Sequence, residues 1–152
     1  MHRLAALVLV GSLTFGTAVA GQGVAKPATL TWAPAPAAFP AGAMMAVVSG
    51  DPGKPGPFMI QISMPDGYKV MPHTHPADET VSVLSGTLLL GMGDTWDATK
   101  AKAIAAGADG KIAANMWHFA GAKGKTVIQV SSMGPFAMNY VNPADDPRNK
   151  SK

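Results

Sequence analysis

The hydrophobic positions of this chain fall into short runs that Gly, Pro, Asp and Asn residues separate. The longer runs predict β-strands at residues 43–50, 58–64, 111–115, 125–133 and 136–141, and a short one lies at 30–32. Residues 79–91 are expected to form two strands around the turn Ser85-Gly86. Only the stretch 94–104 has a pattern that allows a helical turn. Many short strands with turn signals at this spacing predict an all-β sandwich or barrel.

The composition agrees with this fold class. A chain of 152 residues predicts one domain, and 47% hydrophobic residues with 14% charged ones supply one core. The 17 glycines and 13 prolines favour turns and short strands over long helices. The cations are spread thinly, without a basic stripe between aromatic residues, so nucleic acid is not an expected partner.

The first twenty residues have the pattern of a secretory signal peptide. A short basic head precedes an apolar run that is too short to span a bilayer, and Ala18-Val19-Ala20 offers a cleavage site. There is no twin arginine and no cysteine, which favours the general secretory route and excludes both a lipid anchor on cysteine and a disulfide. We therefore expect a secreted or periplasmic protein without a stable membrane anchor, cleaved near Ala20.

Two histidines stand one residue apart in the stretch KVMPHTHPADETVSVLSG, residues 69–86. Pro76 lies between His75 and Glu79 and would break a helix there, so the segment is predicted to be extended. Residues i and i+2 of an extended chain point to one face, and His73 and His75 therefore project together. Two imidazoles side by side can bind one metal ion.

Glu79 opens the next predicted strand, on the face that also carries Val81 and Val83. A carboxylate on that core-facing side is costly to bury alone, and a cation would offset the cost. Beyond the leader, the chain has only three histidines, His73, His75 and His118, and Glu79 is its only glutamate. This concentration favours a metal site over unrelated polar residues in a core.

The same residues resemble a known family. Gly67, His73, His75, Glu79 and Gly86 match every fixed position of G-x5-H-x-H-x3-E-x6-G, the first signature of the cupins.

The second cupin signature, G-x5-P-x-G-x2-H-x3-N, is matched only in part. Gly107 and His118 fit it, whereas Ala113, Asn115 and Ala122 replace the proline, the second glycine and the final asparagine. Asn115 still suits a turn, because asparagine tolerates left-handed backbone. The departures weaken this motif but keep its histidine.

The resemblance implies a double-stranded β-helix, the cupin jelly-roll barrel, with little helix. It implies one metal ion held by His73, His75, Glu79 and His118. We expect a signal peptide at 1–20, a Pro/Ala-rich arm at 21–42, the barrel at 43–141 and a polar tail at 142–152. Small cupins commonly pair, so a homodimer is expected, with Pro27–Pro40 and Trp32 as candidate contacts.

Three imidazoles and one carboxylate suit Fe, Mn, Ni, Cu, Co or Zn. Cupins include oxygenases, decarboxylases, isomerases and binding domains, and fold does not choose among them. In quercetin dioxygenase-like cupins the glutamate ligand also acts as a base, the catalytic role that Glu79 would have here. The favoured function is a metal-dependent, dioxygenase-like oxidoreductase acting on a small organic molecule. The alternative is a non-catalytic cupin that binds or senses a small molecule.

The chain also carries ten methionines, of which Met71 and Met116 lie close in sequence to the metal residues. Their functional interpretation is copper handling by thioether ligands. Their structural interpretation, which we favour, is filling of gaps in a small core.

Overall fold

The computed structural model describes residues 29–150, and the predicted signal peptide lies outside these residues. Nine strands form the fold: β1 (Ala33–Pro34), β2 (Met44–Ser49), β3 (Gly56–Met64), β4 (Lys69–Thr74), β5 (Glu79–Met92), β6 (Lys102–Ala105), β7 (Asp109–Ile112), β8 (His118–Gly134) and β9 (Asn139–Tyr140). Within residues 29–150 the only helical element is a 3₁₀ turn, Pro147–Asn149. None of the helical structure described there is long and apolar enough to cross a bilayer.

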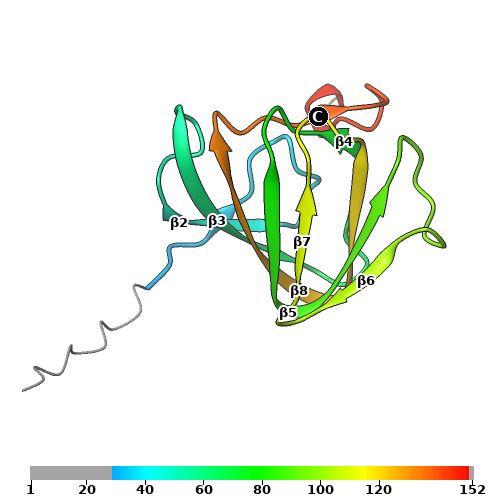
Figure 1. The fold of residues 1–152 in the computed structure, drawn as a ribbon, viewed down its shortest axis with the longest axis horizontal. Coiled ribbons are helices and arrows are strands. Elements are labelled where there is room, and N and C mark those ends of the chain that lie inside the picture. The colour runs from blue at the N-terminus through cyan, green and yellow to red at the C-terminus, as the bar shows by residue number, and fades with distance from the viewer. Residues whose placement is uncertain (1–28, 151–152) are drawn as a thin grey trace, which may run out of the picture.

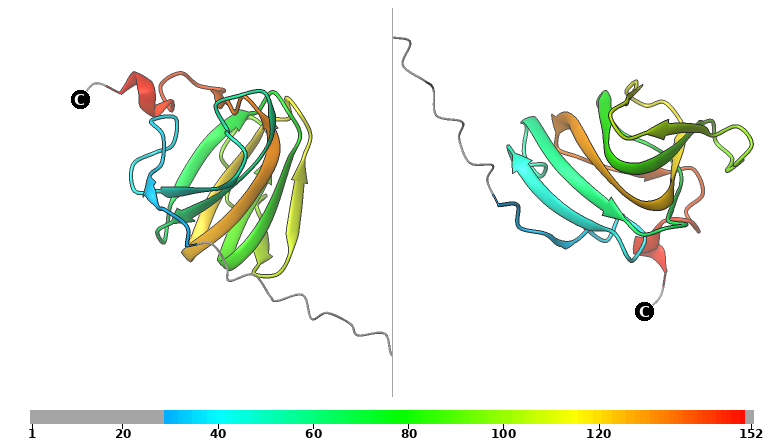
Figure 2. Two further views of the ribbon diagram at one scale, coloured as in Figure 1. Left: turned by 90° about the vertical axis from the view of Figure 1, so that its left-hand side faces the viewer. Right: turned by 90° about the horizontal axis from the view of Figure 1, so that it is seen from below.

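Two long strands, β5 and β8, bend so that one continuous nine-stranded sheet folds into two parts, here called the first and the second sheet. The first half of β8 pairs with β4 and with the second half of β5, whose other edge carries β6. The second half of β8 pairs with β3 and with the first half of β5, whose other edge carries β7. Beyond β3 the second sheet continues to β2 and β1, and β9 pairs with β4 in the first sheet. Figures 1 and 2 show these strands curving around a common interior. The all-β jelly-roll prediction is confirmed.

The change of sheet occurs at Gly86 in β5, opposite the segment around Gly124 in β8. Both glycines have positive φ, +75° and +71°, and the register between the strands shifts between Val83 and Thr87. A left-handed residue lets each strand bend without ending its pairing. Residues 79–91 therefore form one bent strand rather than the two predicted ones.

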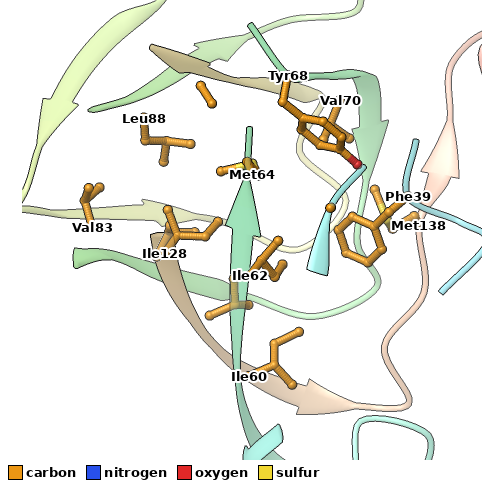
Figure 3. Close-up of a cluster of buried hydrophobic side chains, with 14 of the residues drawn as sticks. Phe39, Ile60, Ile62, Met64, Tyr68, Val70, Val83, Leu88, Ile128 and Met138 are labelled. Carbon is orange, nitrogen blue, oxygen red and sulfur yellow. The ribbon is translucent and has the colours of Figure 1, made fainter. Parts of the chain in front are cut away.

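Alternation along the strands builds the interior. On β3 the side chains of Phe58, Ile60, Ile62 and Met64 are buried, and the residues between them are more exposed. On β5 the same alternation buries Glu79, Val81 and Val83 on one face, as the sequence predicted. Figure 3 shows Ile60, Ile62, Met64 and Val83 among the core side chains that lie between the strands. The period of two places one face of each sheet against the other.

Other predicted elements differ from the structure. The helical turn expected at 94–104 is wrong: Asp97 accepts hydrogen bonds from the backbone N–H and the hydroxyl of Thr99, and residues 102–105 pair with β5 instead. Local side-chain bonds favour a turn there, and strand pairing overrides helix propensity. The short strand expected at 30–32 lies instead at 33–34. Strand β8 begins at His118, seven residues before the predicted 125. It continues across Gly121 and Gly124 because it pairs with β4 on one edge and with β5 on the other.

Candidate metal centre

The four predicted metal residues lie together at one end of three strands. His73 is on β4, His75 directly follows it, Glu79 begins β5 and His118 begins β8. His73 and His118 are opposite each other in the β4–β8 pairing. All four side chains are buried, with exposed fractions of 3%, 4%, 6% and 2% in chain order. The extended segment puts both imidazoles on the interior side, as predicted.

Three backbone carbonyls determine the state of the histidine rings. The Nδ1 atoms of His73, His75 and His118 lie 2.7, 2.7 and 3.0 Å from the carbonyl oxygens of Met71, Ala137 and Met116. A carbonyl oxygen can only accept a hydrogen bond, so each Nδ1 carries the proton and donates it. Each Nε2 of the neutral rings therefore keeps its lone pair, which is the form that binds a metal.

The distances bring these donors near one point. One ring nitrogen from each histidine lies within 4.8 Å of the corresponding atoms of the other two. Two metal–nitrogen bonds of about 2.1 Å can join atoms up to ~4.2 Å apart, so small side-chain rotations would close the group on one ion. Glu79 Oε2 lies 3.4 Å from His75 Nε2 and 3.8 Å from His118 Nε2, at the edge of the group.

Burial sets the charges of the metal-free site. It lowers the pKa of His75 to about 4 and the pKa of His118 below its usual value. The pKa of His73 is held well below its usual value by burial and by the two other imidazoles. Burial raises the pKa of Glu79 to about 7. At neutral pH the contacts between Glu79 and the histidines therefore join neutral rings to a carboxyl group that is only partly ionised, rather than forming ion pairs.

A small cavity extends from the four residues into the barrel. Its volume is about 40 Å³, and its other lining side chains are apolar, among them Ile62, Met64, Leu88, Phe39, Phe136 and Met138. Since one water needs about 10–15 Å³ of such space, the cavity is no larger than about three water molecules. Polar chemistry in this cavity is confined to the histidines and Glu79.

The backbone at position 115 has the left-handed conformation that a glycine would readily adopt, although the second motif has asparagine there. Asn115 has φ +59°, the only positive φ of a non-glycine among the described residues. Its N–H donates to the carbonyl of His75 at 2.8 Å, which ties the β7–β8 loop to the first motif. Asp78 strengthens the same link, because its carboxylate accepts from the N–H of Ala114 at 2.8 Å. The expectation that asparagine serves at this turn is confirmed.

Sequence reasoning missed the groups that orient the rings. Phe136 stacks on His75, with ring centroids 4.8 Å apart and planes 22° from parallel. The carbonyls of Met71 and Met116 lie two residues before a histidine, and this i−2 spacing on an extended chain is a signal that could have been used. Ala137 is 62 residues from its histidine, and no sequence pattern marks it.

Comparison with solved structures identifies the architecture. The structure resembles a candidate acetylacetone dioxygenase from Methylibium petroleiphilum over 92% of this chain and 90% of that one, with 20% identity and a TM-score of 0.59. It also resembles a cupin superfamily protein from Desulfitobacterium hafniense, with 13% identity, 60% and 76% coverage and a TM-score of 0.51.

The chain has the cupin fold. A third structure with similarity to this cupin fold is a polyketide cyclase from Streptomyces resistomycificus, with 16% identity, 69% and 75% coverage and a TM-score of 0.57. No family model matches the sequence, and a search of curated proteins finds no match. The cupin fold therefore rests on structure and on the first motif.

Proposed function

We propose that this cupin binds one divalent transition metal through His73, His75, His118 and Glu79, and that it is a dioxygenase-like enzyme acting on a small organic molecule. The observation that carries the proposal is the set of three buried imidazoles whose Nδ1 protons are committed to backbone carbonyls. Three Nε2 lone pairs without a cation between them would be a costly arrangement to bury. A metal ion satisfies all three and the carboxylate at once.

The donor set limits the metal. Imidazole and carboxylate ligands suit Fe, Mn, Ni, Cu, Co and Zn, and no thiolate is available in a chain without cysteine. With four protein ligands, an octahedral ion keeps two positions for substrate and a second reactant. A redox-active ion in this site would supply the electron exchange that O₂ chemistry requires.

The cavity indicates what kind of molecule fits. No charged side chain other than Glu79 lines it, so a substrate must place its polar atoms at the histidine end and an apolar body among Met64, Leu88 and Phe136. A small molecule with two neighbouring oxygens, such as a β-diketone, has this polarity, and it needs more room than the closed cavity of about 40 Å³ offers, so binding would require a side chain of the lining to move. The candidate acetylacetone dioxygenase of M. petroleiphilum has the same fold, which supports this choice.

Glu79 is the proposed base. Its carboxylate lies in the cavity beside His75 and His118, within reach of a substrate held at the histidine end, and burial raises its pKa to about 7 in the metal-free site. A general base is most effective when its pKa is near the working pH. Glu79 would take a proton from carbon or oxygen of the substrate and hold it at Oε2.

The alternative is metal-dependent binding without catalysis. It is favoured by one observation: the cavity lining provides no second acid or base beside Glu79 and the histidines. Similarity to a polyketide cyclase also shows that the fold accommodates other reactions.

Oxygen uptake distinguishes the two functions. The protein should be purified without oxygen, loaded with Fe²⁺, Mn²⁺, Ni²⁺, Co²⁺, Cu²⁺ or Zn²⁺ in turn, and offered acetylacetone, catechols and flavonols. The proposal expects O₂ consumption with at least one metal and substrate, and a loss of about 10²–10⁴-fold in Glu79→Gln that still holds metal. Tight substrate binding without O₂ consumption under any of these conditions would favour the binding function.

We further propose that the protein acts outside the cytoplasm, because residues 1–20 have the pattern of a signal peptide. The intact mass of exported protein should correspond to a chain that begins at Gly21. Retention of residues 1–20 in a membrane fraction would contradict cleavage.

A homodimer is the proposed assembly. Strand β1 lies at a sheet edge, and Trp32 directly before it is partly exposed. An edge strand next to an exposed aromatic is a site at which two copies could pair. Light scattering at micromolar concentration should give twice the chain mass, and a single-chain mass would contradict the dimer.

A further inference from the structure

The loop between β1 and β2 forms a closed strap over the barrel. We define the strap as residues Ala35–Ala43. Its ends are held together by the β1–β2 pairing and by a hydrogen bond from the N–H of Ala35 to the carbonyl of Ala43 at 3.0 Å. Compact loops with joined ends can move as units, and they often carry function.

Two tyrosines hold the strap on either side of Phe39. The hydroxyl of Tyr140 donates to the carbonyl of Ala38 at 2.7 Å, and the hydroxyl of Tyr68 donates to the carbonyl of Pro40. Phe39 between these two carbonyls is only 9% exposed and enters the hydrophobic core. Figure 3 shows Phe39 beside Met138, with the Tyr68 hydroxyl pointing toward the strap. Tyr68 and Tyr140 are the only tyrosines of the chain.

Phe39 stands between the metal-site cavity and an outer pocket. The outer pocket has a volume of about 250 Å³, and Pro36, Pro52 and Arg148 are among the residues that line it. Phe39, Phe136 and Met138 line both spaces, so these three side chains form the partition between them.

Of the three, Phe39 is the side chain on the movable strap, and it reaches the histidines only through Phe136, on which its ring stacks with centroids 6.2 Å apart. Phe136 is stacked on His75, and its N–H donates to the carbonyl of Pro52 at 2.7 Å. Met138 is fully buried, and Arg148 holds its carbonyl at 2.9 Å. Phe39 is attached to the strap, which the two tyrosine hydroxyls hold to the barrel. Breaking these two hydrogen bonds would withdraw the ring and join the two spaces.

We propose that Phe39 is the gate and the specificity-determining residue of this cupin: the strap admits a small, flat, largely apolar molecule from the outer pocket, and the Phe39 ring limits its bulk. The inference rests on the proposed function, because it concerns access to the same metal site. The ring excludes water when the strap is closed, which is the usual role of a lid. A larger ligand would have to keep Phe39 displaced.

The test measures access to a metal held by the full-length mature protein. Co²⁺ is bound, excess EDTA is added, and the loss of the Co²⁺ absorption is followed in the wild type, in Phe39→Ala and in the double variant Tyr68→Phe/Tyr140→Phe. The double variant should lose metal about tenfold to 100-fold faster than the wild type, because the weights of two hydrogen bonds, each about threefold to tenfold, multiply in the opening equilibrium. The second readout is the spectral shift on adding acetylacetone or the bulkier dibenzoylmethane.

The control is Phe58→Ala, because Phe58 is equally a buried core aromatic but lines neither space. Phe39→Ala should bind dibenzoylmethane, which the wild type and Phe58→Ala should exclude, while all three accept acetylacetone. If Phe39→Ala does not fold, the tyrosine variant alone decides. Unchanged rates of metal loss and unchanged ligand selection in Co²⁺-loaded variants would overturn the gate only. A wild type that holds no Co²⁺ would overturn the proposed function and the gate with it.

Discussion

The two motif segments of the barrel both supply residues to the same site, although they match their cupin signatures to very different extents. Residues 67–86 match every fixed position of the first cupin signature, and residues 107–122 depart from the second at three positions. Nevertheless, His118 from the second segment is as buried as His73 and His75, and it has the same kind of carbonyl partner.

The difference shows which features of a motif are physical requirements. At position 115 the requirement is a left-handed backbone, and Asn115 meets it with φ +59°. At position 122 the buried alanine packs in the core cluster, so the site is built without a polar side chain there. What both segments share is a histidine, His73 or His118, whose Nδ1 pairs with the backbone carbonyl two residues before it.

The largest effect should come from removing one histidine of either segment. His75→Ala and His118→Ala should each weaken metal binding by more than about 100-fold, since even residues that only support a ligand cost 10–100-fold. Metal content after dialysis and the rise of the melting temperature on adding metal would measure this.

Trp117→Phe is the matched control, because Trp117 adjoins His118 but is 39% exposed. It should bind metal like the wild type. A His118→Ala variant that keeps full affinity would show that only the first segment makes the site.

The pH dependence should separate the carboxylate from the imidazoles. A raised pKa of about 7 for Glu79, against an ordinary 4.5, means that this group stabilises the metal-free fold below pH 4.5 and loses that contribution as pH rises through 7. The lowered histidine pKa values act in the opposite sense: their contribution is present above pH 6.5 and is lost as pH falls toward about 4 for His75.

Metal binding needs ionised Glu79 and neutral histidines. Affinity should therefore fall about tenfold per pH unit below about 7, as one proton competes with the ion, and more steeply near pH 4. In Glu79→Gln the proton competition at Glu79 is absent, so the profile between pH 5 and 7 should become shallower than in the wild type. Competition titrations with a chelator indicator would measure the affinities, and a wild-type profile that is flat from pH 5 to 8 would contradict the assignment.

The two glycines that frame the first motif should differ in tolerance. A Cβ at Gly86 would lie 2.5 Å from the carbonyl oxygen of Lys125, whereas a Cβ at Gly67 meets nothing within 4 Å. Gly86→Ala should lower the free energy of unfolding by roughly 2–5 kcal/mol, from about 1–2 for left-handed backbone and about 1–3 for overpacking. Gly67→Ala should cost only the backbone share, about 1–2 kcal/mol. Urea unfolding would measure both, and equal losses would contradict the packing argument.

The smallest effect should come from restoring the missing glycine of the second motif. Asn115→Gly should change stability by less than about 0.5 kcal/mol, because asparagine already adopts this backbone. Asn115→Ala should cost about 1 kcal/mol. Chemical unfolding of the metal-free protein would measure both, and a large gain in Asn115→Gly would show that Asn115 is strained.

Much of the candidate site could be predicted from the sequence, because metal binding uses residue types that are scarce in this chain. Histidine and glutamate are so few in this chain that their number, together with the resemblance to the cupin motifs, singled out four candidate ligands, and Pro76 excluded a helix between His75 and Glu79. The strands were predictable where alternation was clean, as in 58–64. The prediction was wrong at 94–104, because Asp97 and the pairing with β5 override local propensity.

The rest of the site was not predictable for two physical reasons. Any residue can supply a carbonyl, so the role of Ala137 toward His75 depends only on how distant segments pack. Apolar lining residues look like any other core residue, and Phe39 lies in a Pro-rich segment that reads as an extended arm. The C-terminal residues read as a solvated end, yet Arg148 pairs with Asp146 and holds the Met138 carbonyl.

The most direct test of the central claim is a crystal structure of the Co²⁺-loaded mature protein, with anomalous scattering recorded at the cobalt edge. It should show one ion per chain, bound by Nε2 of His73, His75 and His118 at about 2.0–2.2 Å with Glu79 as a fourth ligand, and every Nδ1 still facing its carbonyl. An ion bound elsewhere, at methionine sulfur or through Nδ1, or a protein that takes up no ion at all, would contradict it.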